Sequence, residues 1–424
     1  MKKKKQYITH IPNNGQQGFT LVEFMVASVL GLVVIAGAGA LYSYTKRLND
    51  MGMARVAMLQ DLRSAATMIA QDSRTAGVFG CASLGRRWAP DSTDCSVALA
   101  NADASAVTGG AAALNGIIQL QTLSDDTGLL AEERSAGVRW FKYGDVETSL
   151  KDIWNGIDFT PAVDSGALLF YYGEGSLSFN SSDSTGVTFN TDEPTPNKTV
   201  TNVLNTGGWL VAAGCNTLAF QHSSQGVSSG KTFKITNVPA GSTTASTASS
   251  SAIVPNSDMI LQRYKIVAYV VGTIDGEPIS LYRFEFGAND NGWSAPQQLA
   301  KNVKKMEAEY LFVTDCPAAM EKTSVGTPTP VTVDVNTQKF TVKNANDGNA
   351  VSDDKTVSPD WGKTGAAQGP SSIRLTLTYN FPEIRGGVAT GAVDDDGTPI
   401  DETFNITTVV RGGNVCASRK IVPF

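Results

Sequence analysis

One apolar stretch near the N-terminus limits what this chain can fold into. From Phe24 to Thr45 no residue is charged, and Lys46 and Arg47 end the run. As a helix rising about 1.5 Å per residue, this stretch measures roughly 33 Å, close to the thickness of a bilayer's hydrocarbon core. Four lysines, Lys2 to Lys5, precede it and mark the cytoplasmic side. The sequence therefore predicts one membrane crossing, followed by a region long enough to bury its own core.

A signal anchor or a cleavable secretory signal would explain the same run, and Ala38-Gly39-Ala40 offers a small-residue cleavage site. Two features disagree with both explanations. Residues 6–18 form a polar spacer between the lysines and the apolar run. Glu23 then lies at the start of the run, although a carboxylate costs roughly 2.5 to 3.5 kcal/mol at bilayer depth. We therefore expect this carboxylate to have a partner.

The residues around Glu23, "GFTLVEFMVASV", resemble the class III signal of type IV prepilins, which has a basic leader ending in Gly, then Phe, then an acidic residue at the fifth position. The resemblance implies that prepilin peptidase removes residues 1–18 by cutting between Gly18 and Phe19, and that Phe19 is then N-methylated. It also implies that Glu23 serves subunit assembly. A buried charge is tolerated when an opposite charge meets it, and the new amino terminus of Phe19 supplies one.

The helical pattern continues beyond the membrane segment. Apolar residues recur at spacings of three and four, which is typical of one face of a helix. No proline occurs between Pro12 and Pro90, and Gly77 is suited to end the helix. We expect one helix over residues 19–76, roughly 87 Å long, with a transmembrane part at 19–45. The apolar stripe consists of Leu48, Met51, Leu59, Leu62, Ala66 and Ile69.

Several segments after Cys81 alternate apolar and polar side chains as β-strands do, so residues 77–424 are expected to form a β-rich globular domain with loop insertions at 241–252 and 323–337. Together with the resemblance, this predicts an α+β fold, a pilin-like lollipop. A turn at Ile274–Pro278 joins two long strands, and a short helix is expected between Gln298 and Phe312. The predicted strands are Gly116–Gln121, Gly137–Lys142, Ala167–Tyr172, Trp209–Ala213, Leu218–His222, Met259–Gly272, Ile279–Phe286, Lys339–Lys343, Ile373–Tyr379 and Phe404–Val410.

The five cysteines are widely spaced and form no C-x-x-C pair, so a zinc site of the usual kind is not expected. Behind an export segment they are better interpreted as disulfides. Spacing alone leaves the pairing open. The favoured arrangement joins Cys81 to Cys95 and Cys316 to Cys416, with Cys215 free.

Four later phrases resemble the PilW family of minor pilins: "AQDSRTAGVFGC" from Ala70, "WSAPQQLAKNVKKMEAEYLF" from Trp293, "SSIRLTLTYN" and "FNITTVVRGGN". The middle, residues 96–260, resembles nothing. The resemblance implies a subunit of a minor-pilin complex that primes pilus assembly. Its partners would be prepilin peptidase and, through the N-terminal helix, other minor pilins and the major pilin. It would start as a single-pass inner-membrane protein with a periplasmic globular part, then enter the pilus of a Gram-negative bacterium.

Several functions are not expected. Without the four N-terminal lysines, 30 basic residues face 40 acidic ones, which disfavours nucleic acid. His222 beside Ser223 and Ser224 is no catalytic triad, so we predict no enzyme and no cofactor. The acidic turn at Asp394–Glu402 lacks EF-hand spacing, so no metal is predicted.

Three alternatives to the minor pilin remain. A type II secretion pseudopilin of the J class shares the N-terminus but usually has a smaller globular part. A pilus-tip adhesin would suit the unmatched middle region. A membrane-anchored enzyme would need a nucleophile–base pair, which the sequence does not show.

Overall fold

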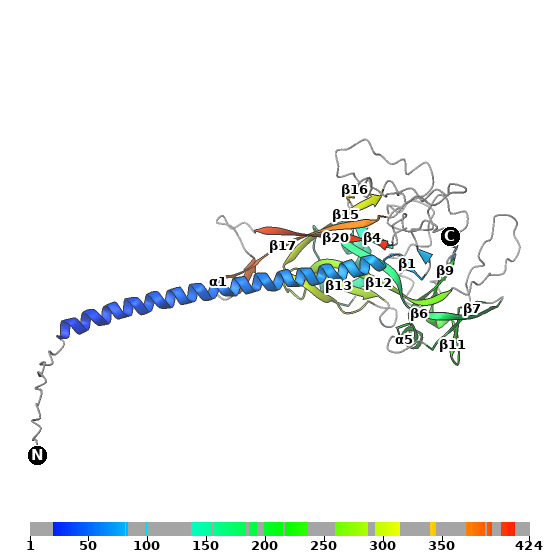
Figure 1. Ribbon diagram of the computed structural model, residues 1–424, viewed down its shortest axis with the longest axis horizontal. Helices are drawn as coiled ribbons and strands as arrows, with labels where there is room; N and C mark the ends of the chain where they lie inside the picture. The colour runs from blue at the N-terminus through cyan, green and yellow to red at the C-terminus, as the bar shows by residue number, and fades with distance from the viewer. Residues whose placement is uncertain are drawn as a thin grey trace, which may run out of the picture.

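A long helix projects from a β-rich region in the computed structural model (Figure 1). Helix α1 spans Leu21–Thr75, and everything after it is built mainly from antiparallel strands. The expected α+β, lollipop-shaped architecture is therefore confirmed. The structure describes residues 20–80, 82–83, 98–100, 137–154, 156–183, 186–192, 199–214, 217–235, 259–286, 293–313, 340–344, 370–385, 388–391 and 400–411.

Local signals at both ends define α1. Thr20 is the N-cap, and its side chain accepts a hydrogen bond from the backbone N–H of Glu23. At the other end, Gly77 adopts a φ of 71°, which glycine tolerates best, and its N–H donates to the carbonyl of Tyr171 at 2.9 Å. This hydrogen bond ties the end of the helix directly to the first long strand of the sheet.

The larger sheet is built around one long central strand. Strand β12 (Ile260–Ile274) pairs with β6 (Ala167–Asp183), β13 (Ser280–Phe286), β8 (Trp209–Ala213) and β5 (Phe159–Pro161). The other described strands of this sheet are β3 (Ala98–Ala100), β4 (Val138–Phe141), β7 (Gly186–Asn190), β9 (Thr217–His222), β10 (Val227–Ser229), β11 (Thr232–Ile235) and β14 (Gln297–Lys301).

The predicted turn between the two long strands is confirmed. Asp275 and Gly276, at φ 49° and 75°, join β12 to β13 in an antiparallel pair. Two consecutive positive φ angles are those of a type I′ turn, whose twist suits a hairpin.

A smaller four-stranded sheet has the order β16-β15-β17-β20. These strands are Phe340–Asn344, Val303–Val313, Ser372–Asn380 and Asp401–Val409. Two hairpins, β1 (Val78–Phe79) with β2 (Ala82–Ser83) and β18 (Pro382–Arg385) with β19 (Val388–Gly391), and four short helices complete the described structure. The helices are α4 (Val146–Leu150), η3 (Lys151–Trp154), α5 (Thr199–Thr206) and η4 (Ser223–Gln225).

The expected short helix between Gln298 and Phe312 was wrong, because this segment forms β14 and β15. The register between β15 and β17 shifts between Val303 and Lys305, so one extra residue is inserted there. The bulge turns both Val303 and Met306 into the core, and both are fully buried. Two inward residues three positions apart imitate helical spacing, which misled the sequence-based prediction.

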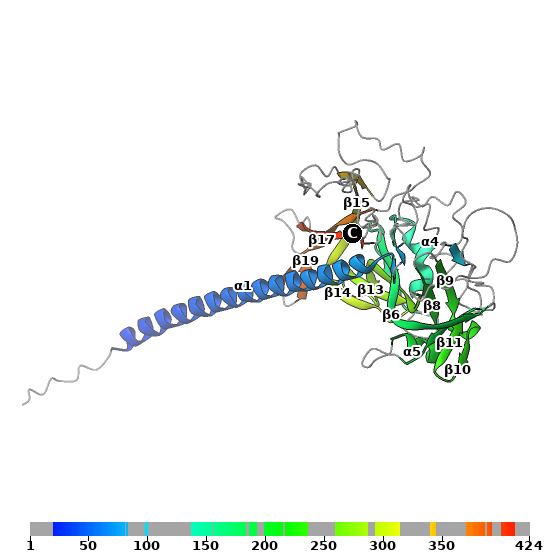
Figure 2. The same ribbon diagram turned by 45° about the vertical axis from the view of Figure 1, so that its right-hand side comes forward.

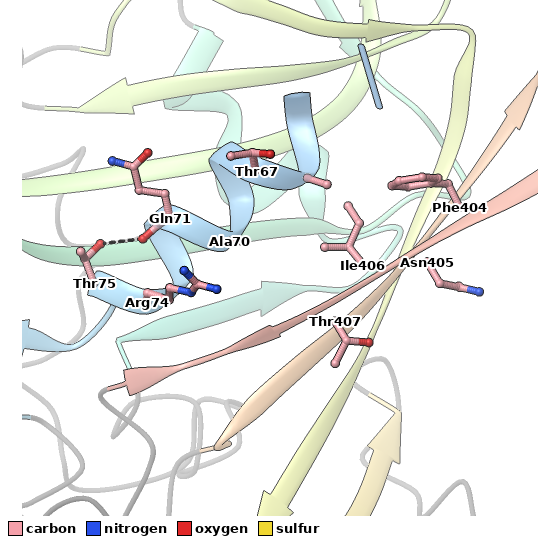
Figure 3. A pocket seen from close by; sticks show the side chains of 10 residues that line it. Thr67, Ala70, Gln71, Arg74, Thr75, Phe404, Asn405, Ile406 and Thr407 are labelled. Atoms are coloured by element: carbon pink, nitrogen blue, oxygen red, sulfur yellow. Dashed lines mark hydrogen bonds between the residues drawn. The ribbon is translucent and has the colours of Figure 1, made fainter. Parts of the chain in front are cut away.

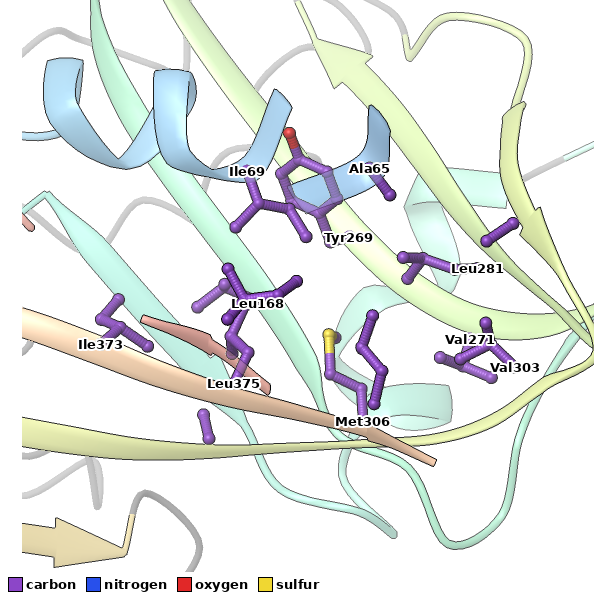
Figure 4. Packing of buried hydrophobic residues seen from close by; sticks show 14 of the residues in the cluster. Ala65, Ile69, Leu168, Tyr269, Val271, Leu281, Val303, Met306, Ile373 and Leu375 are labelled. Carbon is purple, nitrogen blue, oxygen red and sulfur yellow. The ribbon is translucent and has the colours of Figure 1, made fainter. Parts of the chain in front are cut away.

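One apolar cluster joins the second, C-terminal half of α1 to both sheets. Leu62, Ala65 and Ile69 of α1 have no exposed surface. Figure 4 shows Ile69 beside Tyr269 of β12, with Met306 of the smaller sheet below them. Each fully buried aliphatic side chain contributes about 1.5 to 3 kcal/mol, so this contact fixes the helix on the sheets. Of the predicted stripe, Leu62 and Ile69 are buried, whereas Leu48 is 47% exposed.

The other predicted strands in the described ranges agree with the structure to within a few residues, except that β6 continues to Asp183. Strands β1, β2, β3, β5, β7, β10, β11, β18 and β19 were not predicted. Gly116–Gln121 and both loop insertions lie outside the described residues.

Candidate functional site

The first half of α1 is a bare apolar surface. Large hydrophobic side chains from Leu21 to Leu41 are between 54% and 76% exposed. Cβ atoms added at Gly31, Gly37 and Gly39 would meet nothing within 4 Å. Figure 2 shows this half of the helix extending well clear of the sheets. It is the one described helix that is long and apolar enough to cross a membrane. An apolar surface of this size needs lipid or other protein to cover it.

Glu23 lies in the first turn of this helix and forms a reciprocal capping box with Thr20. The backbone N–H and the hydroxyl of Thr20 donate to the Oε2 atom of Glu23 at 3.1 and 3.0 Å. The N–H of Glu23 donates to the Thr20 hydroxyl at 3.3 Å. A negative charge at a helix N-terminus is favoured by the macrodipole. The carboxylate is thus held at the helix start, against the backbone N–H and hydroxyl of Thr20.

The remaining predicted site residues fall outside the described ranges. Gly18 and Phe19 precede Thr20 directly, but their own placement is not described. The disulfide candidates Cys81, Cys95, Cys316 and Cys416, and the fifth cysteine, Cys215, also lie outside these ranges. Cleavage, methylation and disulfide pairing therefore stay predictions.

His222 has a local structural role. Its Nδ1 atom accepts a hydrogen bond from the N–H of Ser224 at 3.2 Å, and the Ser224 hydroxyl oxygen lies 2.6 Å from the same atom. The ring also packs edge-on against Trp209, with centroids 5.6 Å apart. The histidine side chain caps the short helix η4.

A buried ionic site near the C-terminal end of α1 was missed by the sequence analysis. Asp72 is only 6% exposed. Its carboxylate accepts hydrogen bonds from the hydroxyls of Tyr172 on β6 and Tyr269 on β12, at 2.7 and 2.5 Å. The Nε of Arg283 on β13 donates to it at 3.2 Å. One side chain of the helix thus contacts three neighbouring strands.

The ionic contacts continue beyond Asp72 along the same face of the sheet. Arg283 pairs with Glu285 at 3.2 Å, and Glu285 also contacts Arg263 and Lys265. Both of these cations contact Glu174, at 3.3 and 3.1 Å. With Asp72, three anions and three cations therefore balance one another. We call these six residues the docking network.

Burial and neighbouring charges shift several pKa values here. Burial, together with the negative charge of Asp72, raises the pKa of Tyr172 and of Tyr269. Burial alone would raise the pKa of Glu285, but Lys265, Arg263 and Arg283 outweigh it and hold the pKa below its usual value. The tyrosines therefore keep their protons, and Glu285 keeps its charge, across the neutral pH range.

One feature of the sequence could have indicated Asp72. It follows Ile69 by three positions, so it continues the apolar stripe of the helix as a charged residue. A carboxylate on a buried helix face requires partners. Its partners, however, are 100 to 211 positions away in the chain, so the sequence did not identify them.

Comparison with known families identifies the N-terminal segment. Residues 13–39 match the prokaryotic N-terminal methylation motif. No curated protein and no solved structure matches the chain. The match spans the predicted cleavage site, Glu23 and much of the apolar run, and it includes none of the β-rich region. The chain thus carries the class III signal of pilin-like and pseudopilin-like substrates of prepilin peptidase, which fits an inner-membrane-anchored structural protein.

Proposed function

We propose that this chain is a minor pilin resembling the PilW family, which is incorporated into a type IV pilus and helps to prime its assembly in a complex with other minor pilins. The observation that carries the proposal is the helix itself. Its first half is apolar and uncovered, its start holds a fixed carboxylate, and its second half is bound to the globular region by the docking network. Such a helix can pack beside the same helix of other subunits while its β-rich region stays outside the helix bundle.

The proposal gives three N-terminal residues a role. Gly18 precedes the cut, Phe19 becomes the methylated terminus, and Glu23 attracts the amino terminus of a neighbouring subunit. Removing residues 1–18 creates a positive charge four positions before the carboxylate. An ion pair between subunits in an apolar bundle favours one register, because an unpaired charge there is costly.

Mass spectrometry of the mature protein tests the processing step. We expect an N-methylated phenylalanine at residue 19, and a Gly18→Val variant should keep its leader. If Leu41 is the first residue, the chain is instead cut after Ala40 as an ordinary secreted protein, and the proposal fails.

Deletion of the chain tests the role in the pilus. We expect fewer surface pili, with restoration by the wild-type chain and little restoration by Glu23→Gln. Normal pili with a loss of protein secretion would assign the chain to the J class of pseudopilins. Normal pili with a loss of adhesion alone would favour the tip adhesin, which the unmatched region at 96–260 would suit.

A further inference from the structure

A groove lies between the last turns of α1 and strand β20. It has a volume of about 710 Å³, within the range of roughly 300 to 1,000 Å³ that is usual for binding sites. One wall is a stripe of α1 that includes Ala66, Ala70 and Arg74, and the other is Phe404–Thr407 of β20. The two walls are more than 300 positions apart in sequence, so only the fold brings them together.

The groove follows the backbone edge of β20. Successive strand residues point to opposite faces of a sheet, yet four consecutive residues line this groove. Figure 3 shows Phe404 and Ile406 on the side facing the helix, with Asn405 and Thr407 turned away. In the described part of the smaller sheet, β20 is an edge strand that pairs with β17 alone. Every second backbone amide and carbonyl along this edge is therefore directed towards the groove.

The groove is as long as a short strand. Four strand residues at about 3.3 Å each give a length of ~13 Å, and nine helical steps from Ala66 to Thr75 at about 1.5 Å give the same length.

The two walls suit a close-fitting backbone. Ala66 and Ala70 present only methyl groups to the groove. At one end, the hydroxyl of Ser73 donates to the carbonyl of Val409 at 3.0 Å, which fixes the helix to the strand. This hydrogen bond sets the width of the groove at that end.

The charge of the residues that line the groove indicates what kind of molecule would bind there. Arg74 is exposed in the last turn of α1 and lines the groove. It makes no ion pair among the described residues, and no carboxylate is among the described residues that line the groove. Segment 412–424 of the chain itself carries Arg419 and Lys420 and no acidic side chain, so it is a poor match for Arg74.

We propose that this groove binds an extended segment of a partner protein, which adds to the edge of β20 as a strand and presents a carboxylate to Arg74. Backbone hydrogen bonds supply the affinity of such strand addition, and side-chain contacts supply the selectivity. The proposal is independent of filament assembly, because the groove lies between the last turns of α1 and β20 and not on the apolar first half of α1.

Fluorescence anisotropy on the full chain in detergent micelles tests the proposal. The probe is a labelled peptide of alternating threonine and valine with one central glutamate. We expect saturable binding, weakened about twofold to fivefold when lysine replaces the glutamate or when Arg74→Gln is introduced, as for a well-placed exposed ion pair. Ala70→Trp, which fills the groove, should weaken it at least tenfold. The matched control Arg63→Gln removes an exposed charge from the same helix outside the groove and should bind normally.

Thermal unfolding by circular dichroism accompanies each variant, and Arg74→Gln decides the matter if Ala70→Trp does not fold. Equal binding of the glutamate and lysine peptides would overturn the proposal, as would equal losses in Arg74→Gln and Arg63→Gln. Self-association of the wild-type chain that Ala70→Trp abolishes would make a second copy the occupant, and would also overturn it.

Discussion

Replacing Asp72 with asparagine tests whether the docking network holds the helix on the sheets. The substitution keeps the shape of the side chain and removes its charge. Removing one partner of a buried ion pair costs about 3 to 5 kcal/mol, because the other charge stays buried. Here Arg283 keeps its contact with Glu285 at 3.2 Å, which places the cost near the lower limit. An amide also accepts poorly from both Tyr172 and Tyr269, which adds about 1 kcal/mol. We therefore expect a loss of about 4 kcal/mol in the free energy of unfolding.

Urea unfolding of the full chain in detergent micelles, followed by tryptophan fluorescence, measures this loss. Trp140 and Trp209 are buried in the larger sheet and will report on its unfolding. Asp61→Asn is the matched control, because Asp61 lies exposed on the same helix, and its loss should stay below about 0.5 kcal/mol. A double-mutant cycle with Arg283→Gln should give a coupling energy between about 0.5 and 3 kcal/mol. A loss below about 1 kcal/mol for Asp72→Asn, or a coupling near zero, would refute the reasoning.

Three further predictions concern the same region. Glu285 has a lowered pKa in the folded state, so its stabilising contribution is complete above the ordinary pKa of 4.5 and falls as the pH drops below that value. Glu285→Gln should therefore flatten the acid limb of a curve of unfolding free energy against pH. An unchanged acid limb would contradict this prediction. Tyr172 and Tyr269 have raised pKa values, so the stability that they contribute is complete below pH 10.0 and is lost as the pH rises above it. Tyrosinate absorbance from these two residues should therefore rise together with unfolding. Titration of both tyrosines without unfolding would count against the burial argument. Gly137→Ala should cost about 3 kcal/mol or more in urea unfolding, because φ is 72° and the new Cβ would clash with the backbone N of Gly77. The control Gly144→Ala also has a positive φ but open space around it, and should cost about 1 kcal/mol. Equal losses would show that the close approach does not matter.

Sequence periodicity located the strands that alternate inside and outside, or that are apolar throughout. In β17 the buried positions Ile373, Leu375 and Leu377 recur every second residue. Strand β12 is buried on both faces, and its residues 266–271 are all apolar. Short strands with polar residues, such as Val227–Ser229, have no such pattern and were missed. The helix was predictable because its apolar run and its terminal glycine are local features.

The sites that depend on distant residues were not predictable. Glu23 could be singled out because a carboxylate in an apolar run is visible in one segment. Asp72 needs tyrosines and an arginine from three strands, and the groove needs β20 beside α1. No local pattern specifies which residues, separated by one to three hundred positions, a fold will bring together. The bulge at Val303 caused a false prediction for a different reason. It gives a β-strand the local spacing of buried residues that is typical of a helix.

The docking network also determines how the molecule responds to mechanical load. A pull along the axis of α1 is transmitted to β6, β12 and β13 through Asp72 and the end of the helix at Gly77, and not through a flexible connection. Because these contacts join the helix to three strands at once, a force applied at the membrane end is shared by β6, β12 and β13.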